Sequence, residues 1–212
     1  MNPPLAPRRL VVADLACRRG EREIFTGLSF TANPGEIVLL RGPNGAGKST
    51  LLLALCGFLT PAAGRIDWQG GDPERDFGED LHFIGHLSAI KPSLTLAENL
   101  EFWADMLGGM RERVASALDL AGLGGLADYP ASVLSAGQSR RLALARLLVA
   151  PRPVWLLDEP TAALDSAGDR WVASLIDEHV ANGGIAIAAT HLDLALTDAS
   201  RLQTLRIGSR QQ

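Results

Sequence analysis

The chain has 212 residues, of which 47% are hydrophobic and 21% are charged, and its net charge is -4. This is a globular composition, and the charge does not indicate a nucleic-acid partner. The two cysteines, Cys17 and Cys56, are too few for a disulfide-stapled scaffold or a cysteine-rich metal site. No signal peptide and no uncharged apolar run of about 20 residues is visible, so we expect a chain that is soluble by itself.

Apolar runs alternate with helical patterns along the chain. In chain order, we predict strands at 10–15 and 37–41, a helix from about 47 that includes Phe58, strands at 65–68 and 81–85, a mostly helical stretch at 96–150 interrupted by glycines and Pro130, a buried strand at 154–157, a helix at 166–180 and a buried strand at 185–190. This order predicts an α/β core with a helical block inserted in its middle.

A glycine-rich turn follows the predicted strand 37–41. It matches the pattern G-x-x-x-x-G-K-[ST] with the residues Gly42, Pro43, Asn44, Gly45, Ala46, Gly47, Lys48 and Ser49, and Thr50 continues the helix. Such a turn lets backbone N–H groups converge on phosphate oxygens at the positive end of the helix. We therefore predict ATP binding, with Lys48 at the β- and γ-phosphates and the Ser49 hydroxyl on Mg²⁺.

Two carboxylates follow the buried strand 154–157. Asp158 is predicted to hold Mg²⁺, and Glu159 is predicted to orient and deprotonate the attacking water. Ligands bind at the carboxyl ends of strands in open α/β sheets, so this position is the expected one for a second half of the site.

A third segment, Ser135, Ala136, Gly137 and Gln138, opens a long helix that also carries Arg140, Arg141 and Arg146. Ser135 is a good N-cap, and the small residues leave backbone N–H groups open to an anion. Taken by itself, the segment is explained better by helix capping than by anion binding.

Together, these segments and the 163–165 and 190–191 segments resemble the ABC-type ATPases over nearly the whole chain. The resemblance implies one ATP-binding domain over 1–212 with a P-loop NTPase fold: a parallel-sheet core, an antiparallel β subdomain and a helical subdomain at about 88–150. It also implies a head-to-tail dimer with a second copy of the chain. In that dimer the 135–138 signature contacts the γ-phosphate bound to the other subunit, His191 contacts the γ-phosphate in its own subunit, and Asp165 couples the two sites.

Two positions depart from that family. The place of the usual adenine-stacking aromatic residue holds Arg19, whose guanidinium can also stack on a base, although a solvated basic turn explains it equally well. The place of the usual glutamine after strand 81–85 holds Leu87, which cannot bind Mg²⁺ or water. Either His86 takes over that contact or the contact is absent.

Within the family, residues 67–70, 81–103, 134–141 and 155–160 are similar to the ATP-binding export proteins of cytochrome c biogenesis, the haem exporter ATPases. The similarity implies an ATP hydrolase on the cytoplasmic face of the bacterial inner membrane, bound peripherally to an integral subunit of the cytochrome c maturation system. Nothing in the sequence resembles a haem ligand pair, so we assign haem handling to partners.

Two other functions remain open: an ATPase of an unrelated ABC exporter and a soluble ABC ATPase that serves an assembly such as iron–sulfur cluster building. The partner-facing region 85–103, with Phe102 and Trp103 as exposed candidate docking residues or as helical core, should discriminate between a membrane partner and a soluble one. DNA-repair ATPases with the same site carry a long coiled coil between cradle and signature, and this chain shows no sustained heptads there.

Overall fold

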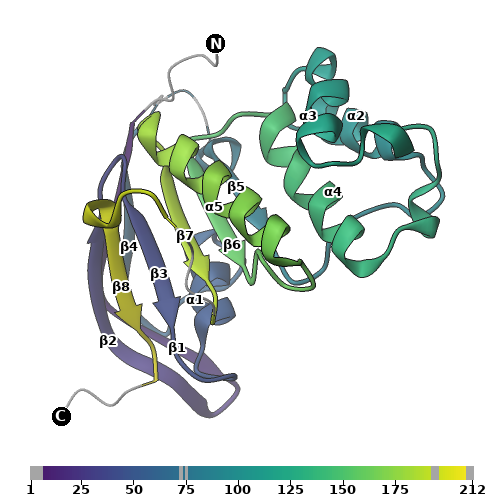
Figure 1. Cartoon of the computed structure of the whole chain (residues 1–212). Helices are drawn as coiled ribbons and strands as arrows, with labels where there is room; N and C mark the ends of the chain where they lie inside the picture. Colours follow the sequence, from purple (N-terminus) through teal and green to yellow (C-terminus); the bar gives the residue numbers. More distant parts are fainter. Residues whose placement is uncertain (1–6, 72–73, 75, 192–195, 209–212) are drawn as a thin grey trace.

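The computed structural model describes residues 7–71, 74, 76–191 and 196–208 (Figure 1). The strands are β1 (Arg8–Arg19), β2 (Arg22–Ala32), β3 (Ile37–Arg41), β4 (Ala63–Gly70), β5 (Leu81–Ile84), β6 (Val154–Asp158), β7 (Ile185–Ala189) and β8 (Leu202–Arg206). The α-helices are α1 (Lys48–Leu55), α2 (Leu96–Met106), α3 (Val114–Leu120), α4 (Ala136–Val149) and α5 (Ser166–Ala181). Short 3₁₀ turns lie at Phe77–Asp80, Arg111–Arg113, Gly124–Leu126, Ala131–Val133 and Ala199–Arg201.

Five parallel strands form the central sheet in the order β5-β6-β7-β3-β8. The strands β6 and β7 are buried at every position, and β3 is buried until Arg41, as expected for a sheet that is covered on both faces. Because successive side chains point to opposite faces, alternate residues of these strands belong to two separate cores.

Each face of the central sheet has its own cover. Val38, Leu40 and Leu156 pack with α1 and with the antiparallel sheet. Leu39 and Leu157 pack with α5 and the middle of α4 on the other face. In Figure 1, α5 runs across the front of the sheet.

The antiparallel sheet has the order β2-β1-β4, so the predicted antiparallel subdomain and the α/β class are confirmed. Two of the strands were not predicted from the sequence. Strand β2 contains Gly27 at φ +65° and has an irregular register against β1, which disturbs the alternating pattern. Strand β8 is a short, mostly exposed edge strand with little apolar signal.

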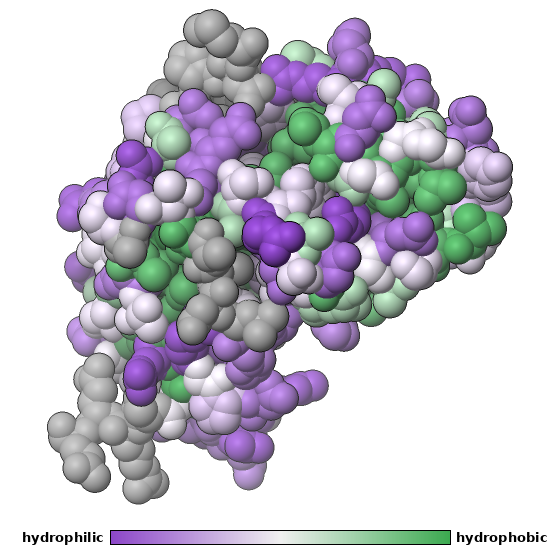
Figure 2. Space-filling view, in the orientation of Figure 1, coloured by the Kyte–Doolittle hydropathy of each residue, from purple (hydrophilic) through white to green (hydrophobic). Residues whose placement is uncertain are grey.

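Helices α2, α3 and α4 form a separate helical layer with its own hydrophobic core. Thr95 begins α2 with a capping box, and Gly108 and Gly122 adopt positive φ where the predicted interruptions occur. In the view of Figure 2, the hydrophobic surface gathers mainly over this layer. Among the described residues, no helix is both long enough and apolar enough to cross a bilayer.

The prediction that the first helix includes Phe58 is wrong. Helix α1 ends at Leu55, and the Phe58 side chain, 75% exposed, lies in the turn that follows. Gly57 at φ +78° redirects the chain there, because the left-handed region that it occupies ends a helix and favours glycine.

Candidate functional site

The phosphate-binding turn connects the end of β3 to the first residue of α1, Lys48. Gly42 and Gly47 have φ values of +151° and +106°, and a Cβ atom at Gly47 would overlap the Ile24 side chain. Glycine is therefore required for both conformation and space. The ammonium group of Lys48 folds back over the turn and donates hydrogen bonds to the carbonyls of Gly42 at 2.8 Å and Pro43 at 3.3 Å.

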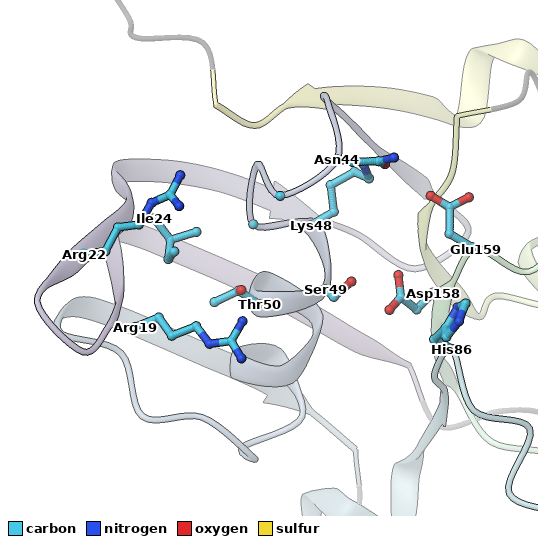
Figure 3. A pocket seen from close by; sticks show the side chains of 12 residues that line it. Arg19, Arg22, Ile24, Asn44, Lys48, Ser49, Thr50, His86, Asp158 and Glu159 are labelled. Atoms are coloured by element: carbon cyan, nitrogen blue, oxygen red, sulfur yellow. The ribbon is translucent and has the colours of Figure 1, made fainter.

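Asp158 is the last residue of β6 and Glu159 the first residue beyond it. Asp158 is buried and lies on the same cavity as the Ser49 hydroxyl (Figure 3). Glu159 has a φ of +47°, an unusual conformation for a residue with a side chain, which is typically kept where function needs it. The Glu159 N–H group donates to the carbonyl of Ala189 at 2.8 Å, which fixes it beside the end of β7.

His191 lies just beyond the end of β7 and joins the two halves of the site. Its Nε2 atom lies 3.3 Å from Glu159 Oε1, 3.1 Å from Lys48 Nζ and 2.8 Å from Asn44 Oδ1. Residues that are more than a hundred positions apart in the sequence therefore converge at one point. This arrangement brings a cation, a carboxylate and an imidazole to the mouth of the phosphate-binding turn.

A cavity of about 540 Å³ opens in front of these groups (Figure 3). It is lined by Arg19, Arg22, Ile24, Asn44, Gly45, Gly47, Lys48, Ser49, Thr50, His86, Asp158 and Glu159. The size is that of a small-molecule site. Arg19 and Arg22 come from the β1–β2 hairpin and line this cavity together with the phosphate-binding turn.

The donor chemistry of this cavity fits Mg²⁺. Ser49 and Asp158 offer a hydroxyl and a carboxylate oxygen, the hard ligands that Mg²⁺ prefers, and Mg²⁺ sites commonly use one or two protein ligands completed by phosphate oxygens and water. Within the described residues, no group of three or more His, Cys, Asp or Glu side chains could hold a metal ion.

Comparisons with known proteins decide the family. A family model described as ABC transporter matches residues 25–162. The cytochrome c biogenesis ATP-binding export protein CcmA of Rhodopseudomonas palustris is 49% identical over 95% of this chain and 98% of its own length, and that of Nitrobacter winogradskyi is 50% identical over 94% and 98%. The chain belongs to the ABC transporter family, within the CcmA group. The predicted resemblance is thereby confirmed.

A solved structure agrees at the level of the fold. A putative ABC transporter ATP-binding protein from Pyrococcus furiosus superposes with a TM-score of 0.81 at 24% identity, covering 94% of this chain and 97% of the other. Like the other domains of this family, the chain is an ATP-hydrolysing ABC domain.

The segment 135–138, assigned to the ABC signature by its resemblance, begins α4 as predicted. Ser135 is the N-cap, and its hydroxyl accepts from the Gln138 N–H group at 3.2 Å while the Gln138 side chain accepts from the Ser135 N–H group at 3.0 Å. A Cβ atom at Gly137 would lie 2.8 Å from the carbonyl of Ala163, so the helix start packs closely on the segment after Glu159. Neither these residues nor Ala136 line the cavity of their own chain.

Asp165 is exposed at the N-cap of α5. Its carboxylate accepts from the Gly168 N–H group at 2.8 Å and pairs with Arg141 at 3.2 Å. The Gly168 N–H group and then the Arg141 guanidinium lower the pKa of Asp165. Arg141 comes from α4, so this ion pair joins the signature helix to α5.

His86 and Leu87, the two neighbouring residues shortly after β5, lie in different places. His86 lines the nucleotide cavity together with Asp158, whereas Leu87 lies 83% exposed on a neighbouring groove. Of the two alternatives, this placement favours His86 as a substitute for the missing glutamine.

Phe102 and Trp103 are half-buried in the structure, which lies between the two alternatives of exposed docking residues and helical core. Trp103 lies under the guanidinium of Arg146 at 4.6 Å and lines the groove, while Phe102 packs edge-on against it and under Lys91. Sequence reasoning also missed Arg22, Ile24 and Arg140. Arg22 and Ile24 lie on β2, a strand that was not predicted, and no motif marks them.

Proposed function

We propose that the chain is the ATP-hydrolysing subunit of a membrane ABC complex that energises haem delivery for c-type cytochrome biogenesis. The observation that carries this proposal is a cavity lined by Lys48, Asp158 and Glu159, with His191 in contact with Lys48 and Glu159. The chain that holds it is about half identical to proteins named for cytochrome c biogenesis export.

In the proposed reaction, the oxygen of a water molecule attacks the γ-phosphorus of ATP, and the bond to the β,γ-bridging oxygen breaks. The Glu159 carboxylate orients this water and takes its proton. Lys48 leaves the carbonyls of its own turn to neutralise charge on the β- and γ-phosphates, and His191 donates to the γ-phosphate. Ser49 and Asp158 would hold Mg²⁺, which would supply positive charge beside the phosphates when bound.

The nucleotide cavity of one chain lacks the signature, because residues 135–138 lie outside its lining. We therefore propose that two copies pair head to tail and that each signature contacts the γ-phosphate bound to the other. Residues 1–212 act as one ATP-binding domain in which the helical subdomain, about 88–150, presents the signature, and Asp165 couples the two sites. Arg19 stacks on the adenine base through its guanidinium.

The membrane partner is proposed to dock in the groove of about 560 Å³ beside β5. This groove is lined mainly by apolar residues, among them Leu53, Phe58, Leu81, Phe83, Leu87, Trp103 and Leu107. It is continuous with the nucleotide cavity through Ser49, His86 and Asp158, which line both. Docking there would place the chain peripherally at the cytoplasmic face of the inner membrane. It would also link the part of the nucleotide cavity that binds the phosphates to the membrane partner.

The mechanism is tested by Glu159→Gln. We expect this variant to bind ATP and to dimerise but to lose at least about 10²-fold in turnover, because the amide cannot take the proton. Glu178→Gln, at an exposed position of α5, is the matched control and should keep full turnover. Near-normal turnover of Glu159→Gln would remove Glu159 from the role of base.

The partner is tested by purifying the tagged chain from gently solubilised membranes. Recovery of an integral subunit together with cytochrome c maturation proteins supports the proposal. An unrelated permease would leave the ATPase and discard haem delivery, and a partner found only in the soluble fraction would favour the assembly alternative.

A further inference from the structure

Strand β5 is an edge strand, and its outer carbonyl groups are occupied by arginine side chains instead of another strand. Arg140 donates to the carbonyl of Gly85 at 2.8 Å, Arg146 to that of Phe83, and Arg152 to that of Leu81 at 3.4 Å. These acceptors are alternate residues, so their carbonyls point to the same side of the strand. All three arginines are buried, two of them on α4 and the third just after it.

Arg140 differs from the other two because it also reaches the end of β6. Its Nη2 group donates to the carbonyls of Asp158 at 2.5 Å and Glu159 at 2.7 Å, and its Nε group donates to that of Pro160 at 3.2 Å. With Gly85, one guanidinium thus binds four carbonyl oxygens from two separate segments.

The side chain of Arg140 is costly to bury, and among the described residues no carboxylate forms an ion pair with it at contact distance. The residue is only 4% exposed, and burial lowers the pKa of its guanidinium, an effect that the charges of Asp158 and Glu159 partly oppose. A buried cation bound only by carbonyls stabilises a fold poorly compared with an apolar residue, so a positioning role is the better explanation.

The carbonyls that Arg140 binds belong to the residues that hold Glu159 in place. Glu159 has the left-handed φ of +47°, which is strained for a residue with a side chain and persists only where the surroundings impose it. Arg140 lies five positions after the N-cap Ser135, on the same rigid helix as the signature. The guanidinium is therefore a direct link between the signature helix and the backbone of the proposed base.

We infer that Arg140 is a positioning residue for ATP hydrolysis. It sets the backbone of residues 158–160, and through it the carboxylate of Glu159, relative to the signature helix and to Gly85, the neighbour of His86. The inference rests on the proposed role of Glu159 as the base. A shift of about 1 Å in such a group can cost about 10²-fold in rate.

The test compares Arg140→Lys and Arg140→Gln with Arg152→Lys, measuring kcat and KM for MgATP on the purified chain together with Tm. A lysine ammonium has three donors on one atom and cannot span four carbonyls. We expect kcat to fall by about 10- to 100-fold in both Arg140 variants while KM for ATP changes by less than about threefold. Arg152→Lys changes a buried guanidinium that donates to the carbonyl of Leu81 in the same strand, four residues before Gly85, and it should keep kcat.

The Arg140→Gln variant removes the buried charge, so it gives a second route if the lysine variant does not fold. An unchanged kcat in a folded Arg140 variant, or an equal loss in Arg152→Lys, would overturn the inference. A parallel rise in KM and fall in Tm without a fall in kcat would also overturn it, because that pattern indicates a merely structural arginine. Glu159→Gln, measured in the same series, separates the two proposals. If Glu159→Gln keeps its turnover, the proposed role of Glu159 as the base is wrong. If Glu159→Gln is inactive while the Arg140 variants are active, only the inference about Arg140 is contradicted.

Discussion

The phosphate-binding turn and the β5 edge are neighbours, but they are built in different ways. In the turn, conformation and ligand groups come from eight consecutive residues, with Gly42 and Gly47 giving the backbone and Lys48 the charge. At β5, the strand is held by arginines from α4 and beyond, more than 50 positions away. The first region is encoded locally and the second by tertiary contacts, so substitutions should act differently in the two.

The largest effect is expected in the locally encoded region. Lys48→Ala removes the ammonium that is proposed to neutralise charge on the phosphates, so we expect ATP hydrolysis to fall by at least about 10²-fold. Lys91→Ala is the matched control, because Lys91 is the other lysine of the chain and lies on the Phe102 ring instead. Measured turnover of Lys48→Ala within tenfold of the control would show that the turn works without this side chain.

The same contrast explains what the sequence could predict. The buried strands β3, β6 and β7 were placed to within a residue, because continuous apolar runs beside glycine or acidic residues are strong local signals. The capping of α4 by Ser135 was also predictable from a short pattern, and its geometry is confirmed. Strands β2 and β8 were missed, because one is interrupted by irregular pairing and the other is an exposed edge.

In the site, the phosphate-binding turn and the pair Asp158 and Glu159 were recognisable as motifs, and the structure brings them together with His191. Arg140 was visible only as one of several arginines in a helix. Its function depends on carbonyl groups at positions 85 and 158–160, and no pattern in a single sequence encodes such a contact.

A second prediction concerns two buried histidines at the end of the central sheet formed by β5 and β6. His82 lies in β5 and binds the carbonyl of Ala150, and His179 of α5 stacks on Trp155 with ring centroids 3.9 Å apart. Burial lowers the pKa of His82 to about 3 and that of His179 to about 4. Both side chains are therefore largely neutral in the folded protein above about pH 5.

The unfolded chain takes up protons on these residues near pH 6.5, so it binds more protons than the folded chain once the pH falls below that value. The free energy of unfolding is therefore at its full value above about pH 7. It decreases by about 1.4 kcal/mol per histidine for each pH unit below about 6.5. Between pH 7.5 and 5.5 we expect a total loss of about 2–3 kcal/mol, measured by denaturant unfolding. His179→Gln should halve this slope, whatever its own stability, and an unfolding free energy that is flat over the range would contradict the two low pKa values.

The smallest effect is expected at Leu87, where the groove beside β5 meets the proposed membrane partner. Its side chain contributes little to the fold at 83% exposure, so Leu87→Asp should leave Tm and ATP binding unchanged. In the complex, the same change would place a carboxylate among Phe58, Trp103 and Leu107, and we expect retention of the membrane subunit to fall by about tenfold in pull-downs from solubilised membranes. Leu120→Asp makes the same change at a site on α3 that is 61% exposed and outside the groove, and it should retain the partner fully. If both variants retain the membrane subunit equally, the docking site lies outside the groove. If only Leu87→Asp loses the membrane subunit, the position where the family usually has glutamine is part of an apolar contact in this chain. His86 is then the residue left to face the nucleotide.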